Sequence, residues 1–332
     1  MVIMDFRLTL LFLLTLVVSY LAQKFWEKRA KLAGLSGKDI HKKNQPEVAE
    51  MGGLPVVFSF IVGAFSFLGI RVFVYGTHEY SSSIFAIVLA VLLAAMIGMV
   101  DDILGWKIGL RQWQKPVLTL LVAFPIMAVD AGVRVMYFPF FGQFDLGLLY
   151  PFLVIPAVVL IGSNGTNMLA GFNGLEAGLA TIIISTLAYL SYLKGITWIT
   201  VLCLLILISI VVFLLFFNRY PAKMFPGDTF TYATGAFISA IVIFADMEKA
   251  FLILFIPFVI EFFMKARGKF QKESFAKLKE DGNLTLRYDK LYGLEHLMIW
   301  FLEKFKVAVT ERKVVFLLLL FQLIFAILAL II

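Results

Sequence analysis

Residues 164–178, NGTNMLAGFNGLEAG, place three asparagines, four glycines and one glutamate between two strongly apolar runs at 148–162 and 179–193. Polar groups left unpaired beside lipid hydrocarbon are costly, so membrane proteins place them where a site or a cavity satisfies them. The segment therefore predicts a break between two membrane helices that lines a binding site. The alternative is a glycine-rich helix break whose asparagines serve only as caps.

The composition of the chain is that of an integral membrane protein. Of its 332 residues 61% are hydrophobic and 15% are charged, and the mean hydropathy is +0.96, whereas soluble domains are about 45–50% apolar. We predict an all-α polytopic fold in a single domain, residues 1–332, with about ten transmembrane helices of about 20 apolar residues each. The expected spans are 5–25, 53–75, 83–100, 115–130, 148–163, 176–193, 197–217, 229–245, 250–264 and 313–332.

The basic residues are distributed unevenly between the two sides that ten spans define. One side consists of the loops 24–50, 101–115, 163–175, 218–228 and 265–313, and it holds 24 of the 29 Lys and Arg residues. The positive-inside rule makes that side cytoplasmic, where the basic loops face anionic lipid headgroups. The expected partner of these charges is therefore the lipid bilayer and not a nucleic acid.

Two smaller elements are expected outside the spans. Residues 131–147 alternate aromatic and other residues around Phe141-Gly142, which favours a small β-hairpin at the outer interface. An irregular aromatic loop fits the same residues. Residues 289–306 predict an amphipathic helix on the membrane surface. Its expected apolar face consists of Leu291, Leu294, Leu297, Met298 and Phe301.

Two adjacent carboxylates, Asp101 and Asp102, close the apolar run MIGMV. A carboxylate at a helix C-terminus opposes the helix dipole, so this pair requires a metal ion or a basic side chain nearby. The alternative for Asp101 is a cap on the turn that follows. Lys115 opens the next span, where it could hold a phosphate or could only anchor the helix at the lipid headgroups.

Two further cytoplasmic loops carry carboxylates beside glycines. Residues 39–53, DIHKKNQPEVAEMGG, offer Glu47 and Glu50 to a nucleotide or a phosphate, although an ordinary basic loop beside the membrane has a similar composition. Residues 225–229, FPGDT, place Asp228 before an apolar helix. Asp228 could be a simple N-cap, or it could be an oxygen ligand of a metal at a helix start that also attracts anions.

The opening segment supplies the remaining polar groups. Asn167 offers an amide oxygen of the kind that Mg²⁺ accepts. Gly171 allows a ligand to approach the backbone closely, and the donor–acceptor amide of Asn173 could bind a flat heterocycle. Together with the carboxylates and lysines, these groups predict a Mg²⁺ or Mn²⁺ site for a diphosphate ligand. Histidine-based zinc chemistry is not expected, because His78 lies on the opposite side from His41 and His296.

Three motifs resemble one known superfamily, the polyprenyl-phosphate N-acetylhexosamine-1-phosphate transferases. GMVDDILG at 98–105 is similar to its first acidic motif, and NMLAGFNGLEAG at 167–178 resembles its eukaryotic and archaeal branch, which makes dolichyl-diphosphate N-acetylglucosamine. FPGDTF at 225–230 resembles the Gly-Asp-Thr-Phe motif of that branch. The bacterial histidine-rich motif is missing from 265–290, and this loop is shorter than in the animal enzyme. An archaeal cell membrane is therefore expected, in preference to the endoplasmic reticulum.

The resemblance implies a role for each motif residue. Asn167 and Asp228 would bind Mg²⁺, with Asp101 and Asp102 beside the metal and the lipid phosphate. Lys115 would hold phosphate oxygens. The implied substrate contacts are Gly171 and Asn173 with uracil, Phe225 against the uracil ring, and Arg267 with the acetamido sugar.

The implied reaction is the transfer of N-acetylglucosamine-1-phosphate (GlcNAc-1-phosphate) from UDP-GlcNAc to dolichyl or another polyprenyl phosphate. UMP would leave, and the lipid-linked diphosphate sugar would start N-glycan assembly. A homodimer is common in the superfamily. The alternative from another class is a transporter or flippase for a nucleotide sugar or a polyprenyl lipid, because such proteins also contain broken helices with polar centres.

Overall fold

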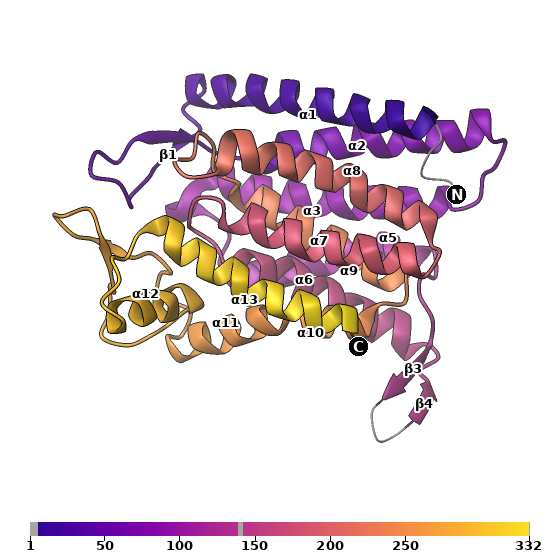
Figure 1. The fold of residues 1–332 in the computed structure, drawn as a ribbon. Helices are drawn as coiled ribbons and strands as arrows, with labels where there is room; N and C mark the ends of the chain where they lie inside the picture. The colour runs from indigo at the N-terminus through magenta and orange to yellow at the C-terminus, as the bar shows by residue number, and fades with distance from the viewer. Residues whose placement is uncertain (1–5, 139–141, 332) are drawn as a thin grey trace.

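Eight helices of the described chain are long and apolar enough to cross a membrane, and they lie side by side in one bundle (Figure 1). The computed structural model describes residues 6–138 and 142–331. The eight spans are α1 Phe6–Leu32, α2 Gly53–Gly69 with the π-helical turn η1 Ile70–Val74, α3 Ser81–Ile108, η3 Tyr150–Val154 with α6 Ile155–Met168, α7 Leu175–Leu193, α8 Thr197–Phe213 with η4 Leu214–Asn218, α9 Gly227–Phe244 and α13 Glu311–Ile331. Helix α3 is kinked near its end, at Gly105, where the backbone leaves helical geometry. The prediction of an all-α polytopic fold is confirmed.

The other two expected spans, 115–130 and 250–264, are broken helices. The first consists of α4 Gln114–Thr119, the 3₁₀ turn η2 Leu120–Ala123 and α5 Phe124–Ala128, and the second of α10 Glu248–Leu254 and α11 Ile256–Arg267. Pro125 and Pro257 stand in the first turn of α5 and α11. Proline is tolerated in a first turn but breaks a helix interior, which accounts for new helices beginning there. Asp5 and Ile332, which bound the first and last predicted spans, lie outside the described residues.

Helix α9 is the centre of the bundle, and 83% of its residues are buried. It packs mainly against α3 and α6. A Cβ atom on Gly98 of α3 would lie 2.4 Å from the backbone carbonyl of Asp228, and one on Gly235 of α9 would lie 2.4 Å from the carbonyl oxygen of Gly162 in α6. Small residues at these contacts let the helix backbones approach closely. The end of α3 is therefore held directly beside the beginning of α9.

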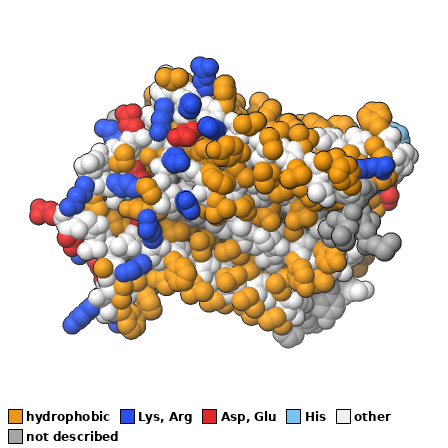
Figure 2. All heavy atoms as spheres, turned by 45° about the horizontal axis from the view of Figure 1, so that its top comes forward, with side chains coloured by type: hydrophobic (Ala, Val, Ile, Leu, Met, Phe, Trp, Pro, Cys, Tyr) orange, Lys and Arg blue, Asp and Glu red, His pale blue; other side chains and the backbone are white. Residues whose placement is uncertain are grey.

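The two ends of the bundle differ in charge. Lys and Arg side chains gather at one end in Figure 2, whereas hydrophobic side chains cover most of the remaining surface on that face. This charged end carries α12 Leu294–Lys304 and two short strand pairs, β1 Ser36–Lys38 with β2 Glu47–Ala49 and β5 Lys277–Leu278 with β6 Leu284–Thr285. A hydrophobic surface with one charged end is the arrangement expected of a membrane-spanning bundle.

The two smaller predicted elements are present. Strands β3 Val135–Phe138 and β4 Gly142–Asp145 form the predicted antiparallel hairpin at the opposite end from α12 (Figure 1); Phe141 lies outside the described residues. Helix α12 lies within 289–306, and the contact of its expected apolar face with the membrane stays a prediction. Phe301 is 44% exposed, and the buried hydrophobic residues of α12 are Leu294, Ile299 and Leu302. These three residues are buried because α12 packs against α11 and α13.

Candidate active site

Asp102 caps the beginning of α9. Its Oδ1 accepts the backbone N–H of Asp228 at 2.7 Å, and its Oδ2 accepts the backbone N–H of Thr229 at 2.9 Å and the Thr229 hydroxyl at 2.6 Å. Gly227 has a φ of +72°, and a Cβ there would lie 2.5 Å from Asp102 Oδ2. A carboxylate at this position satisfies free N–H groups and complements the helix dipole. The cap therefore comes from Asp102, and Asp228 is not the simple N-cap that the sequence allowed.

Lys115 joins two carboxylates from different helices. Its Nζ lies 2.7 Å from Asp101 Oδ2 and 2.8 Å from Asp228 Oδ2, and its side chain is 21% exposed. Asp101 also accepts the backbone N–H of Leu110 at 2.5 Å, so the predicted turn cap exists beside the ion pair. The structure thus brings Asp101, Lys115 and Asp228 into one centre, with the ammonium group between two carboxylates.

Asn167 extends this centre from the end of α6. Its Nδ2 donates to Asp228 Oδ2 at 3.0 Å and to the Tyr232 hydroxyl at 3.3 Å, while its Oδ1 accepts the Thr231 hydroxyl at 3.0 Å. All four residues belong to the facing ends of α6 and α9. The two residues predicted as metal ligands, Asn167 and Asp228, are therefore in direct contact.

The donor set of this centre fits Mg²⁺. Mg²⁺ takes carboxylate and amide oxygens and usually keeps positions for water and substrate phosphates, so one carboxylate and one amide are a sufficient protein contribution. Asp228 already presents a carboxylate oxygen to the centre. The oxygen of Asn167 instead faces the Thr231 hydroxyl, so its use as a ligand requires the amide to exchange this hydrogen bond for the ion.

The glycine-rich connection between α6 and α7 forms a second part of the site. Gly171 has a φ of +109°, in the left-handed region that favours glycine, and its N–H donates to Glu176 Oε1 at 2.8 Å. Asn173 is buried, its backbone N–H donates to Glu311 Oε1 at 2.7 Å, and its Nδ2 donates to Asp39 Oδ2 at 2.9 Å. The predicted uracil-binding residues therefore lie in a loop that is fixed by carboxylates on both sides.

Phe225 and Glu50 belong to two segments that pair beside the centre. The Phe225 N–H donates to the Ala49 carbonyl at 2.7 Å, and the Gly52 N–H donates to the Phe225 carbonyl at 2.9 Å. Burial, together with the negative charge of Asp102, raises the pKa of Glu50 above its ordinary value of 4.5. The Gly53 N–H also donates to the carbonyl of Pro226 at 2.9 Å, so this loop lies directly beside the capped beginning of α9.

Glu47 and Arg267 lie apart from this centre. Glu47 is exposed on β2, where Ser36 Oγ lies 3.5 Å from its carboxylate. Arg267 is exposed at the end of α11, donates to the carbonyl of Leu291 and has its guanidinium carbon 5.6 Å from the Tyr292 ring centroid. No contact between either side chain and Asp101, Lys115 or Asp228 is found in the described ranges. Their substrate contacts stay predictions.

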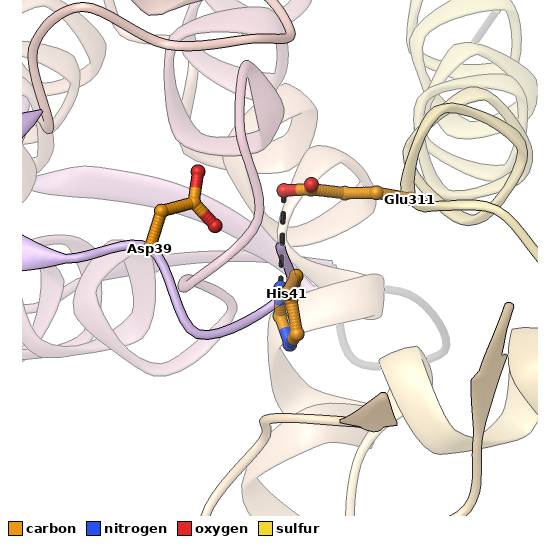
Figure 3. Close-up of side chains that lie close together, drawn as sticks. All are labelled: Asp39, His41 and Glu311. Carbon is orange, nitrogen blue, oxygen red and sulfur yellow. Dashed lines mark ion pairs between the residues drawn. The ribbon is translucent and has the colours of Figure 1, made fainter. Parts of the chain in front are cut away.

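Sequence reasoning missed the buried cluster of Asp39, His41 and Glu311 (Figure 3). Potential ligand atoms of these three residues lie within 4.8 Å of one another. The Lys42 ammonium already bonds to Asp39 and lies 4.0 Å from Glu311 Oε2, so the cluster has its own cation. No local pattern reveals it, because Glu311 opens α13 as an acidic residue at a helix start commonly does.

A second missed network ties the end of α11 to the site. The Lys265 ammonium donates to the carbonyl of Met168, the neighbour of Asn167, and lies 3.5 Å from Glu261 Oε1. Glu261 Oε2 in turn accepts the N–H of Leu294 at 2.6 Å. Burial raises the pKa of Glu295, which follows on α12, well above its ordinary value, and the charge of Glu261 adds to this effect. Lys265 thus links α11 and α12 to the end of α6.

Comparison with known proteins places this polar centre in a protein family. The model for "Glycosyl transferase family 4" matches residues 84–246 of the chain. This region begins within α3 and ends after α9, so it contains the Asp101–Lys115–Asp228 centre and the whole glycine-rich connection. The family match and the polar centre therefore coincide in the chain.

Three relatives illustrate the similarity. A protein of Saccharolobus solfataricus, provisionally named UDP-N-acetylglucosamine–dolichyl-phosphate N-acetylglucosaminephosphotransferase, is 35% identical over 320 residues, 96% of this chain and 94% of the relative. A protein of the same provisional name from Sulfolobus acidocaldarius is 32% identical over 319 residues, 94% of this chain and 92% of the relative. The Dictyostelium discoideum enzyme of that name is 26% identical over 267 residues, 69% of this chain and 64% of the relative. This chain therefore belongs to glycosyl transferase family 4, the phosphotransferase family that its motifs predicted.

Proposed function

We propose that this protein transfers GlcNAc-1-phosphate from UDP-GlcNAc to dolichyl or another polyprenyl phosphate, with release of UMP. The names of its archaeal and eukaryotic relatives support this reaction. The observation that carries the proposal is the contact of one ammonium group, Lys115 Nζ, with Asp101 and Asp228 at the capped beginning of α9. A cation held at a helix N-terminus is suited to a diphosphate.

The reaction we infer is a single displacement at phosphorus. An oxygen of the lipid phosphate attacks the sugar-proximal phosphorus of UDP-GlcNAc, a new P–O bond forms, and the P–O bond to UMP breaks. A phosphate monoester has a second pKa of about 6, so the nucleophile is largely a dianion at neutral pH and needs no strong general base. The protein is then required mainly to position the two phosphates and to neutralise charge.

Each residue of the centre has a separate role in positioning the phosphates or neutralising their charge. Lys115 stabilises negative charge on the phosphate oxygens, and Asp101 orients the Lys115 ammonium at 2.7 Å. Asp102 holds the beginning of α9 and so positions Asp228. We propose Asn167 and Asp228 as the residues that hold Mg²⁺, with Mn²⁺ as a substitute; when bound, the ion supplies positive charge to the diphosphate.

The substrate contacts are proposed on the same basis. Gly171 and Asn173 would bind the uracil, and Phe225 would pack against its ring. Glu50, close to the capped end of α9, supports a role for the 47–50 segment in nucleotide binding. Arg267 is proposed for the acetamido sugar because it lies in the last turn of α11, which Lys265 ties to the end of α6.

The cellular setting is also part of the proposal. We propose that residues 1–332 form one transferase domain in an archaeal cell membrane, with the charged end facing the cytoplasm and the product starting N-glycan assembly. The excess of Lys and Arg at this end supports that orientation. The family resemblance is the basis for proposing a homodimer.

The experiment that tests the function uses purified full-length protein with UDP-GlcNAc, a defined polyprenyl phosphate and Mg²⁺. We expect UMP release together with a lipid product whose mass has increased by one GlcNAc-1-phosphate group. A transporter or flippase would consume no UDP-GlcNAc, so unchanged UDP-GlcNAc in the presence of correctly folded protein contradicts the proposal. The named relatives are transferases and give no support to transport.

A further inference from the structure

The amide of Asn173 is held in one orientation by a carboxylate from a distant loop. Its Nδ2 donates to Asp39 Oδ2 at 2.9 Å, and the residue is 6% exposed. Asp39 follows β1, so the two residues come from segments that are 134 positions apart in the chain. Contacts of this kind between buried side chains specify geometry more strongly than contacts at an exposed loop.

The chemistry of the pair decides which end of the amide faces Asp39. A carboxylate oxygen only accepts hydrogen bonds, so the NH₂ group of Asn173 must point toward it. The Lys42 ammonium donates to the same Asp39 oxygen. The amide oxygen of Asn173 therefore points to the other side. Neither recorded hydrogen bond of Asn173 uses this oxygen, which leaves an acceptor available to a ligand.

The surrounding cluster keeps the arrangement rigid. Glu311 Oε1 accepts the backbone N–H of Asn173 at 2.7 Å and lies 3.8 Å from His41 Nδ1 (Figure 3). The His41 ring lies 4.5 Å from the Phe172 ring between centroids, and His41 Nε2 accepts the backbone N–H of Ala276 at 3.2 Å. The Asn173 loop is thus fixed by the loop after α1, by the beginning of α13 and, through His41, by the segment before β5.

We propose that Asp39 is a positioning residue that determines base specificity, because it makes Asn173 present a hydrogen-bond acceptor to the nucleobase. Uracil carries an N–H donor at N3, whereas cytosine carries an acceptor at N3. With the amide held by Asp39, uracil forms a hydrogen bond to Asn173 Oδ1, and cytosine places two acceptors against each other. A released amide could turn its oxygen toward the N3–H of uracil or its NH₂ group toward N3 of cytosine. The inference rests on the proposed function, since it requires Asn173 to face the nucleotide.

The test measures binding of three nucleotides to the full-length protein in detergent with Mg²⁺. We expect UMP to bind more tightly than both CMP and N3-methylated UMP by about tenfold or more, because each of the latter leaves the buried acceptor unpaired. Asp39→Ala should bring the affinities for UMP and CMP to within about threefold of each other, as the amide becomes free to turn, whereas N3-methylated UMP still offers no partner at N3. Asp39→Asn should give an intermediate ratio, because its own amide oxygen can still accept from Asn173.

Two controls separate specificity from damage to the fold. Glu280→Ala removes an exposed carboxylate between β5 and β6 and should retain the preference of the wild-type protein for UMP. Thermal unfolding of each variant checks that it is folded. Binding of the methylated nucleotide is measured on the wild-type protein. It therefore tests whether the protein recognises the N3–H of uracil even if Asp39→Ala unfolds.

The outcomes distinguish this inference from the proposed function. If the wild-type protein releases no UMP from UDP-GlcNAc and binds no UMP, the proposed function is wrong and the inference falls with it. If the wild-type protein catalyses transfer but binds UMP and N3-methylated UMP equally, only the inference is overturned. A folded Asp39→Ala variant that keeps the full preference for UMP overturns it as well.

Discussion

Replacing Lys115 by methionine tests the centre on which the proposed function depends. Methionine keeps an unbranched apolar stem of similar reach and removes the charge that lies 2.7 Å from Asp101 and 2.8 Å from Asp228. Loss of one group that stabilises transition-state charge costs about 10²–10³-fold in kcat, or about 3–4 kcal/mol. Because the Lys115 side chain keeps 21% exposure and is partly screened by water, we expect the lower end, a loss of about 100-fold.

The measurement is steady-state release of UMP from UDP-GlcNAc with saturating lipid phosphate and Mg²⁺, alongside Tm by thermal unfolding. The loss should appear in kcat, because the charge on the transferred phosphate develops in the transition state. Lys31→Met removes an equal charge from an exposed position at the end of α1 and should leave kcat unchanged. A folded Lys115→Met protein that retains kcat within about threefold of the wild-type value refutes the assigned role of Lys115.

Two further predictions concern the capped end of α9. Asp102→Asn replaces one acceptor oxygen by an NH₂ donor that faces the N–H of Thr229 or Asp228. We therefore expect Tm and kcat to fall together, with a loss of about 1–2 kcal/mol in the free energy of unfolding. Unchanged Tm with unchanged kcat contradicts a positioning role for Asp102. Glu50 has a raised pKa, so the folded protein binds this proton more tightly than the unfolded chain does. The unfolding free energy should therefore decrease as pH rises from 4.5 through the raised pKa. Thermal unfolding of Glu50→Gln across this range should lack that decrease, and an identical pH profile contradicts the assignment.

The residue types of the centre could be predicted from the sequence, but their division of labour could not. Asp101, Asp102 and Lys115 are conspicuous because charges are rare in an apolar chain. Consecutive residues on an α-helix point about 100° apart, so only one of two adjacent aspartates can face a given neighbour. In the structure Asp101 faces Lys115 and Asp102 faces the beginning of α9. That choice depends on the packing of α3 on α9, which no local pattern encodes.

The contacts that hold Asn173 could not be predicted for a different reason. Asp39 and Glu311 lie 134 and 138 positions from Asn173 in the chain. Each has an ordinary explanation on its own: Asp39 follows a short strand, and Glu311 begins a helix. Sequence patterns report local structure, whereas these contacts arise only when the loop after α1 and the beginning of α13 meet at the charged end.

The position of these contacts relative to the family match suggests how the two halves of the site are built. Residues 84–246 contain Asp101, Lys115 and Asp228, the groups assigned to phosphate chemistry. Asp39 and Glu311, which orient Asn173, both lie outside this region. A chain cut down to 84–246 would keep the three charged side chains but would lose Asp39, which accepts from the Asn173 side-chain amide, and Glu311, which accepts from the Asn173 backbone N–H. We therefore predict that selection of the nucleobase requires the loop after α1 and the beginning of α13, whose described residues make no contact in the Lys115 centre.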